Sequence, residues 1–489
     1  MNVEFIEEPE LQFGSDRHVD IRFGVMNYHP FDVGESRRPS VIKVGVVGTN
    51  ETIEGTIKWL QKCRGEIPAR SSSKPNLFPK FPGFSEDSPF RSKLVFDDAL
   101  NRAIRPREFI ALSKAKSLND RVETAVTLFM EEIAILSEKQ TDVIICAMPS
   151  ELIEMMAQGE EQEGIEPLAD EKEEHEDDKD DRSQFVFHDL LKARAMKFAK
   201  PLQVLRPSTY DESKRKRETD RHAKSRSLQD EATRAWNFLT ALYYKAGGFP
   251  WRMLRKESDP DTCFVGISFY QSLDQKKLRT SMAQVFNERG YGVVVRGGTV
   301  KVSKEDRQPH LSKAASSKLL NEALSRYKKE HHNLPARVVV HKTSIFNQDE
   351  LAGCESAISD LDIDSFDLLS VAESYTRLFR TGYYPPLRGT LLNIDDSKQV
   401  LYTRGSVDFY QEYAGLYVPK SLLIRREKAD ATPMQLATEI LQLTKMNWNN
   451  TQFDSLTPIT VKAARDVGKM LKYVTGKNEP VQDSYRFYM

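Results

Sequence analysis

Buried strands that alternate with helices constrain the fold of the first half of this chain. Residues 41–49, VIKVGVVGT, form an apolar run, and the helical pattern of residues 50–63, NETIEGTIKWLQKC, follows at once. A second apolar run, DVIICAMP at residues 142–149, follows a long stretch with helical spacing at residues 117–139. Apolar strands that are joined by helices are typical of a parallel sheet. The sequence therefore predicts an α/β unit with a Rossmann-like sheet.

The length of 489 residues exceeds what one hydrophobic core usually supports, so we expect more than one domain. The composition changes at FPWRMLRKESDPD, where we place a boundary. Beyond it, strand-like runs such as TCFVGISFYQ and ARVVVHKTSIF are mixed with helical segments, which favours a second, mixed sheet with flanking helices. The predicted parts are an N-terminal leader at 1–35, a first domain at 36–250 and a second domain at 251–489.

Charge is distributed unevenly along the chain. Residues 160–181 contain thirteen acidic residues and two lysines, a net charge of −11, whereas the whole chain carries −1. The remainder is therefore basic, and residues 211–227 form a strongly basic stretch. We expect the acidic run to be a flexible loop. A basic body is compatible with binding a phosphate backbone, and equally with an ordinary solvated surface.

Cysteine usage and hydropathy indicate the compartment. No CxxC pair occurs among the four cysteines, which argues against a zinc site and a disulfide scaffold. No apolar run is long enough for a membrane span, and the acidic N-terminus lacks the core of a signal peptide. We expect a cytoplasmic protein without a membrane partner.

Four polar residues are candidates for a binding site. His188 and Lys192 are four positions apart on one predicted helix, so they share a face. Gln203 follows in a short strand, and Lys245 ends a later helix just before Gly-Gly. If folding brings them together, the lysines supply positive charge to phosphate oxygens, while the amide bonds to phosphate or to a base edge. Each residue alone is compatible with a plain surface position.

The order of these residues resembles the guide-binding MID domain of Argonaute proteins. That family has a ring-bearing residue, a lysine four positions later, a glutamine about a dozen positions later and a lysine before Gly-Gly. The resemblance assigns His188, Lys192, Gln203 and Lys245 to the 5′ phosphate and first base of a guide strand. The family often has a further lysine one helical turn before the last one, and this chain has Ala241 there.

The second half resembles the PIWI domain, an RNase H-like fold in which carboxylates hold two divalent metals for phosphodiester cleavage. FVGISF resembles the strand of the first aspartate and has Ser268 at that position, and VVVHKTSIF resembles the second with Thr343. LTPITVKAAR resembles the late helix and has Arg465 where the family has Asp or His. The remaining glutamate has no clear match, although Glu305 and Glu322 lie in the right region. The resemblance implies a PIWI domain without catalytic residues.

The C-terminus adds a metal expectation. In Argonautes the terminal carboxylate can help to hold a metal at the guide 5′ phosphate, which assigns Mg²⁺ or Mn²⁺ to Met489. The aromatic residues Tyr485, Phe487 and Tyr488 are equally consistent with simple packing on a core.

Taken over most of the chain, the resemblance is to a short prokaryotic Argonaute without a PAZ domain. It implies an antiphage defence protein that binds a 5′-phosphorylated guide RNA and a complementary single-stranded DNA target. It also implies a heterodimer with an APAZ-containing effector, typically a SIR2 or TIR module that hydrolyses NAD and sometimes a nuclease. Target pairing activates that partner, often by oligomerisation, whereas this chain is not itself an enzyme.

Two other hypotheses for the function stay open. An active guide-directed endonuclease could use other carboxylates, such as Asp360, Asp362 or Asp364. A nucleotide-binding α/β enzyme could use VGVVGTNE as its phosphate loop, although that segment lacks both G-x-G-x-x-G and the Walker lysine.

Overall fold

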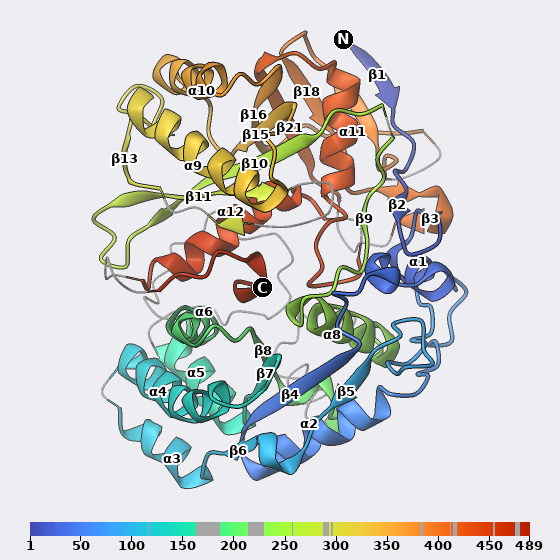
Figure 1. Ribbon diagram of the computed structural model, residues 1–489, viewed down its shortest axis with the longest axis vertical. Helices are drawn as coiled ribbons and strands as arrows, with labels where there is room; N and C mark the ends of the chain where they lie inside the picture. Colours follow the sequence, from blue (N-terminus) through green and yellow to red (C-terminus); the bar gives the residue numbers. More distant parts are fainter. Residues whose placement is uncertain are drawn as a thin grey trace. The chain divides into compact units, whose positions relative to one another are not determined.

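The computed structural model divides the chain into two compact units. The small-sheet unit comprises residues 33–248 and 473–482, and the large-sheet unit comprises residues 1–32, 249–472 and 483–489. Figure 1 shows both units, coloured along the sequence. The structure describes residues 1–115, 117–162, 186–213, 229–256, 258–286, 293–294, 297–381, 385–410, 412–413, 418–452, 455–474 and 480–489.

Two charged segments of the sequence fall largely beyond this description. Of the acidic run at 160–181, residues 163–181 lie outside the described residues, and only its start belongs to the end of helix α5 (Ser150–Gln162). Residues 214–227 of the basic stretch also lie outside them.

A parallel sheet forms the core of the small-sheet unit. Its order is β5-β4-β7-β8, with β6 also beside β4, and every pair is parallel. β4 (Val41–Gly48) and β7 (Val143–Ala147) are the apolar runs of the sequence, and β7 is buried throughout. The further elements are β5 (Lys93–Val95), β6 (Asn101–Ala103), α3 (Pro106–Ala111), α4 (Leu118–Ser137), α6 (Phe187–Ala195), β8 (Leu202–Leu205) and α8 (Glu231–Lys245).

Helix α2 (Asn50–Lys62) follows β4 without a loop because Thr49 and Thr52 cap it reciprocally. The backbone N–H of Thr52 donates to Thr49 Oγ1 at 3.3 Å, and the backbone N–H of Thr49 donates to Thr52 Oγ1 at 2.9 Å. This arrangement satisfies two of the backbone donors that a helix start leaves unpaired.

Aromatic packing fixes helix α8, which ends at a predicted site residue. Trp236 and Tyr243 on α8 pack against Phe81, Phe84 and Phe90, with ring centroids 4.7–6.3 Å apart within this cluster. The indole N–H of Trp236 also donates to the Lys80 carbonyl at 2.9 Å. Large buried rings of this kind hold an element in one position, so the C-terminal end of α8 is placed by the core.

An extended mixed sheet forms the large-sheet unit. Its central strands are β10, β15 and β16, which are parallel to one another, with β11 antiparallel to β10 and β21 antiparallel to β16. The strand order is β1 (Asn2–Phe5), β17 (Thr390–Asn393), β18 (Lys398–Leu401), β21 (Ser421–Ala429), β16 (Ser365–Ser374), β15 (Arg337–Lys342), β10 (Thr262–Gln271), β11 (Leu278–Phe286), β13 (Thr299–Val302) and β14 (Pro309–His310), with β12 (Val293–Val294) beside β11.

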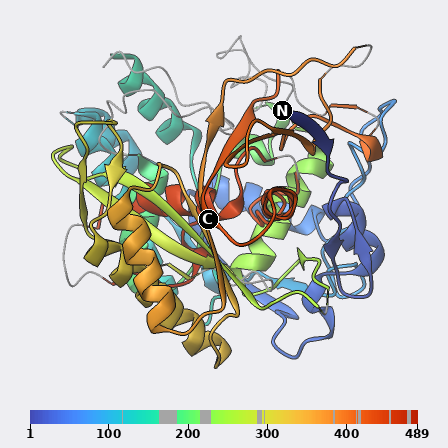
Figure 2. The same cartoon turned by 90° about the horizontal axis from the view of Figure 1, so that it is seen from above.

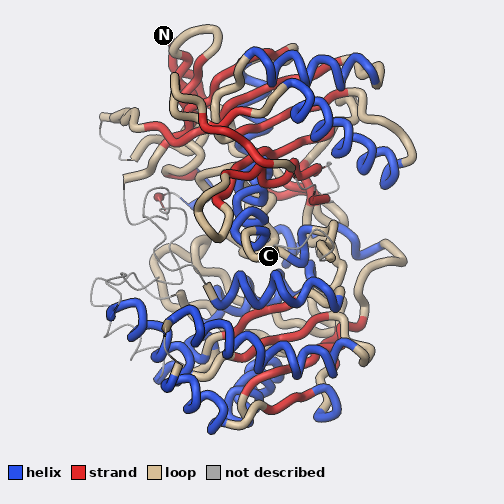
Figure 3. The backbone as a smooth tube through the Cα atoms, turned by 90° about the vertical axis from the view of Figure 1, so that its left-hand side faces the viewer, coloured by secondary structure: helices blue, strands red, loops and turns tan. Residues whose placement is uncertain are grey.

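Helices cover both faces of this sheet. α9 (Lys313–His331) and α10 (Gln348–Asp360) share a buried apolar cluster with alternate residues of β10 and β15, and Figure 2 shows the two helices side by side. α11 (Pro433–Leu443) and α12 (Ile459–Leu471) lie on the opposite face, where Arg337 of β15 bonds to Glu439 of α11 and Gly266 of β10 contacts α12. α12 approaches β10 so closely that a Cβ on Gly266 would come within 2.1 Å of the Thr460 carbonyl oxygen. Figure 3 shows the strands of each unit between its helices.

Residues 1–32 belong to the large-sheet unit. Strand β1 forms its edge through antiparallel pairing with β17. Glu8 anchors this segment because its carboxylate accepts hydrogen bonds from Arg388 Nε at 2.8 Å and Lys445 Nζ at 3.0 Å. Although burial acts to raise the pKa of Glu8, the two cations hold it below its ordinary value. The remaining elements are β2 (Leu11–Gln12), β3 (Arg17–His18), α1 (Ile21–Tyr28), β9 (Arg252–Met253), β19 (Ser406–Val407) and β20 (Glu412–Tyr413).

Within the described ranges, none of the helices combines the length and the apolar composition that crossing a membrane requires.

Candidate functional site

The C-terminal residue of α8, Lys245, is a buried lysine. Its side chain is almost enclosed, and the residue is 1% exposed. Its ammonium group donates to Gln203 Oε1 at 2.5 Å, across 42 positions of sequence. Gln203 belongs to β8, and its register partner on the neighbouring strand is Ile145. The sheet and the end of α8 therefore bring these two predicted residues into direct contact.

A second cation lies near Lys245. Lys192 is on α6 and is 3% exposed. Burial lowers the pKa of Lys245 well below its ordinary value, and the charge of Lys192 lowers it further. Two neighbouring ammonium groups at a site largely removed from water favour the binding of an anion.

His188 precedes Lys192 by one helical turn, as the sequence predicts. Its ring is 46% exposed, and Nδ1 lies 2.8 Å from Asp189 Oδ1. Loss of hydration on the protein side of the ring lowers the pKa of His188, and Lys192 lowers it further, against the opposing influence of Asp189. A neutral, half-exposed ring beside two buried cations can stack on a planar group without adding to their repulsion.

A buried cysteine near the two lysines was not among the residues selected from the sequence. Cys146 on β7 is fully buried, and burial raises the pKa of its thiol to about 12. The positive charges of Lys192 and Lys245 act to lower this pKa, so the thiol is close enough to both lysines for their charges to affect it. Ala241, one turn before Lys245, is 1% exposed and contributes only apolar packing.

The donors of the cluster suit an anion. Two ammonium groups and an amide N–H present hydrogen-bond donors, and phosphate oxygens accept them. In the part of the chain that the structure describes, no group of three or more His, Cys, Asp or Glu side chains is arranged to hold a metal ion. Met489, whose carboxylate the sequence predicts as a metal ligand, belongs to the large-sheet unit. The C-terminal aromatic residues Tyr485, Phe487 and Tyr488 are buried, as packing on a core requires.

Two of the three PIWI-like positions lie side by side. Parallel pairing of β10 and β15 runs to Ile267 and Lys342, and the backbone N–H of Thr343 donates to the Ile267 carbonyl at 3.1 Å. Ser268 and Thr343 are the next residues on these two neighbouring strands. They therefore lie at the same edge of the parallel strands, toward the carboxyl ends, and each carries a hydroxyl group. Arg465 lies on α12, the helix that packs on β10.

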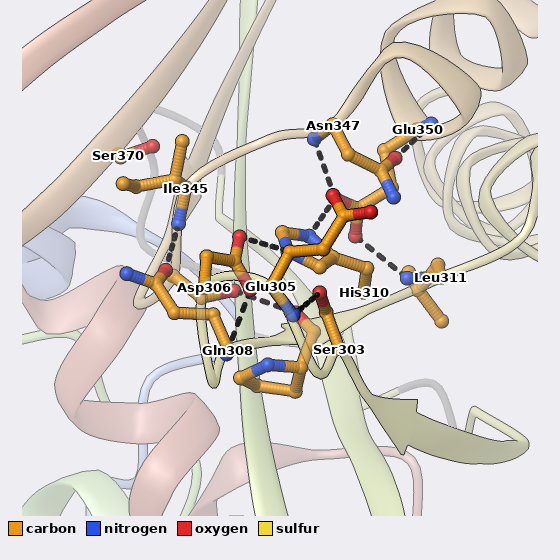
Figure 4. A network of polar contacts seen from close by, with 12 residues as sticks. Ser303, Glu305, Asp306, Gln308, His310, Leu311, Ile345, Asn347, Glu350 and Ser370 are labelled. Carbon is orange, nitrogen blue, oxygen red and sulfur yellow. Dashed lines mark hydrogen bonds and ion pairs between the residues drawn. The ribbon is translucent and has the colours of Figure 1, made fainter.

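The buried carboxylate beside this edge is already engaged. Glu350 on α10 is fully buried, and it pairs with the ammonium group of Lys342 at 2.7 Å. Its carboxylate also accepts hydrogen bonds from the backbone N–H groups of Leu311 at 2.8 Å and Asn347 at 3.0 Å. His310 Nδ1 lies 3.0 Å from Glu350 Oε2. Figure 4 shows the network around Glu350. Burial lowers the pKa of Lys342, although Glu350 opposes this shift.

The other carboxylates that the sequence suggested lie elsewhere. Glu305 is exposed in the loop after β13. Glu322 on α9 forms an ion pair with Arg326, in which Glu322 Oε1 and Arg326 Nη2 are 3.6 Å apart. Asp360, Asp362 and Asp364 are exposed around the turn that precedes β16. Because β16 is parallel to β15, this turn lies at the amino edge of the strands, opposite to Ser268 and Thr343. The structure does not bring these aspartates to that edge.

The glycine segment after β4 has a packing role. A Cβ on Gly48 would come within 2.4 Å of Thr52 Oγ1 and 2.7 Å of the Ala147 carbonyl oxygen, so a side chain would clash with the helix cap and with β7. Thr49 already caps α2. The segment therefore closes a strand-to-helix junction.

Three solved structures that share this fold are Argonautes. The structure of Clostridium butyricum Argonaute, bound to a guide DNA and a 19-mer target DNA, matches with a TM-score of 0.64 and 13% identity, over 96% of this chain and 53% of that one. A. aeolicus Argonaute matches with a TM-score of 0.57 and 14% identity, over 98% and 55%. A structure of Aa-Ago with externally bound siRNA matches with a TM-score of 0.57 and 16% identity, over 100% and 56%.

These matches confirm the predicted fold class, a Rossmann-like MID domain followed by an RNase H-like PIWI domain. This chain spans about half the length of the Argonautes that it matches. No family model matches the sequence, and a search of curated proteins finds no match either.

Proposed function

We propose that this chain is a guide-RNA-directed sensor of invading DNA in a prokaryotic defence system. The observation that carries the proposal is the cluster of the buried Lys192 and Lys245 with the half-buried Gln203 in the small-sheet unit. The Argonaute fold supports it, since one matching structure is bound to a guide and a target DNA and another to an siRNA. In this proposal the cluster holds the 5′ phosphate of the guide.

The chemistry of the cluster matches a terminal phosphate. Lys245 and Lys192 place positive charge on its oxygens, and the amide of Gln203 adds a hydrogen-bond donor. The half-exposed ring of His188 stacks on the first base of the guide. The rest of the guide reads the single-stranded DNA target by base pairing, so sequence specificity does not depend on side chains of the protein.

We further propose that the chain does not cleave its target. Two-metal cleavage requires several carboxylates, because hard divalent cations take oxygen ligands with negative charge. Ser268 and Thr343 offer neutral hydroxyl groups instead, and Arg465 is a cation. Glu350, the buried carboxylate nearby, is held by Lys342 and by two backbone N–H groups.

The output of such a sensor comes from a partner chain. We propose an APAZ-containing effector with a SIR2 or TIR module, so that NAD hydrolysis resides in that chain and begins when target pairing activates it. We also propose that Mg²⁺ or Mn²⁺ binds at the guide 5′ phosphate, with the terminal carboxylate of Met489 as a ligand. The ion would supply positive charge to phosphate oxygens in addition to that of the two lysines.

One experiment tests the central claim. The chain is purified together with the product of its neighbouring gene, and the bound nucleic acids are end-labelled and sequenced. Short RNAs with a 5′ phosphate are the expected result. If nucleic acid is absent from the wild-type complex, or if Lys192→Met and Lys245→Met together retain the same RNAs, the cluster is not a guide site.

A further inference from the structure

Two aromatic side chains stand out from the surface of the large-sheet unit. Tyr375 and Phe379 follow strand β16 and are 85% and 81% exposed. Exposure alternates along the segment SYTRLFRT at residues 374–381, with Tyr375, Arg377 and Phe379 exposed and the residues between them turned inward or half-buried. In an extended chain, side chains two positions apart point to one side and are about 7 Å apart. The segment therefore presents a ring, a cation and a second ring in a row.

The backbone of this segment is held in place. The hydroxyl of Tyr402, a residue that is 1% exposed, accepts the backbone N–H of Leu378 at 2.6 Å and donates to the Thr376 carbonyl at 3.3 Å. The hydroxyl of Ser421 donates to the same carbonyl at 3.1 Å. The side chain of Tyr402, just after β18, and that of Ser421, at the start of β21, thus hold the backbone of the segment, and the rings project from a supported position.

The segment that carries the rings is itself positively charged. Residues 374–381 contain two arginines and no acidic residue. Arg377 lies between the rings, and its guanidinium donates to the Ser374 carbonyl at 3.1 Å, which keeps it close to the backbone. The carboxylate just before the segment, Glu373, is paired with Lys420 at 2.5 Å. A polyanion that approaches this ridge meets no unpaired negative charge from the segment itself.

We propose that Tyr375, Arg377 and Phe379 form a stacking platform for single-stranded nucleic acid. Exposed rings that alternate with a cation fit the two components of such ligands, since bases stack on the rings and the phosphate between them pairs with the arginine. The inference rests on the proposed function only for the identity of the strand, which would be the unpaired part of the DNA target. Exposed aromatic residues also occur at protein interfaces, and the test below separates the two cases.

The test uses fluorescein-labelled oligo(dT) without a 5′ phosphate, so that the lysine cluster of the small-sheet unit is not engaged. With the full chain, Tyr375→Ala combined with Phe379→Ala should weaken binding by about tenfold or more, because each stacked base is lost. Tyr375→Phe and Phe379→Tyr keep the rings and should bind as the wild type does. Arg377→Gln should lower the slope of log affinity against log salt by about 0.7, the contribution of one phosphate on a single strand.

Controls separate this site from the guide site and from misfolding. Val302→Ala removes an exposed apolar side chain of the same unit, 51% exposed, and should leave oligo(dT) binding unchanged. Thermal unfolding of each variant should match the wild type. The affinity for a 5′-phosphorylated guide is measured separately, so a failure of the lysine cluster is visible without affecting the oligo(dT) result.

Ultraviolet crosslinking to oligonucleotides that contain 5-iodouracil, followed by mass spectrometry, should map to Tyr375 or Phe379. If oligo(dT) affinity is unchanged in the double alanine variant, the platform does not exist. If that variant loses co-purification of a partner protein and keeps its affinity for oligo(dT), the ridge is a protein-docking surface and the proposal is wrong.

Discussion

Replacing Lys245 by methionine separates a binding role from a structural one. Methionine keeps the length and apolar contacts of the side chain but removes the ammonium group that contacts Gln203. A hydrogen bond to a charged group contributes about 1.5–3 kcal/mol. The affinity for a 5′-phosphorylated guide should therefore fall about 10- to 150-fold. A guide that ends in a 5′ hydroxyl should bind the variant and the wild type equally.

The same substitution should not lower the stability of the protein without guide. Lys245 is a buried cation beside Lys192, so removing its charge removes an unfavourable term, and the half-buried oxygen of Gln203 can bond to water. Because the pKa of Lys245 is lowered on folding, the unfolded chain binds more protons between the folded pKa and the ordinary value of lysine. The free energy of unfolding of the wild type should therefore rise with pH across this interval, and Lys245→Met should show a smaller rise.

Guide binding should have the opposite pH dependence. A bound phosphate favours the charged form of Lys245 and raises its pKa, so the protein takes up a proton on binding. Affinity should fall as the pH rises above the pKa of the free protein. Fluorescence anisotropy with the two guides, at several pH values, and denaturant unfolding measure these effects. If Lys245→Met weakens both guides equally, or destabilises the free protein by several kcal/mol, Lys245 is a structural residue and the phosphate assignment fails.

Four further variants test the rest of the molecule. Lys192→Met should weaken binding of the phosphorylated guide by roughly 1.5–3 kcal/mol in anisotropy, while a 5′-hydroxyl guide should not distinguish it from the wild type. Ser268→Asp combined with Thr343→Asp should give no metal-dependent cleavage of labelled target DNA, because Arg465 remains. The appearance of cut products would contradict the proposal that these strand ends cannot hold two metals. Glu350→Gln should destabilise the chain by about 3–5 kcal/mol in urea unfolding, because Lys342 loses its buried counter-charge. Glu355→Gln on the same helix, which breaks the exposed pair with Lys428, should cost about 0–1 kcal/mol, and equal losses would show that burial does not decide the difference.

The sequence by itself determined the elements and the face on which some residues lie. The apolar runs at residues 41–48 and 143–147 are short and continuous and lie beside segments of helical periodicity, which is typical of buried parallel strands, and they became neighbouring strands of one parallel sheet. His188 and Lys192 share a face because helical geometry fixes a spacing of four. The apolar runs of β10 and β15 are clear in the sequence, so it could be predicted that Ser268 and Thr343 belong to these strand ends.

The sequence offers no local sign of several contacts that define the site. Gln203 and Lys245 meet because β8 and the end of α8 are brought together by the sheet and by the packing of Trp236 and Tyr243. Glu350 looks like an ordinary residue of a polar helix start, yet the fold buries it against Lys342. Such pairs depend on which surfaces pack, which periodicity does not specify.

Tertiary structure also decided where a late segment belongs. Residues 473–482 follow the last long helix of the large-sheet unit, but they are part of the small-sheet unit. The hydroxyl of Tyr473 accepts the backbone N–H of Val186 at 2.8 Å, and the amide of Gln482 donates to the Met196 carbonyl at 2.8 Å. These contacts join positions 286 or more residues apart. Local propensity sets which residues form helices and strands, whereas only the folded chain decides which distant polar groups lose water together and must pair.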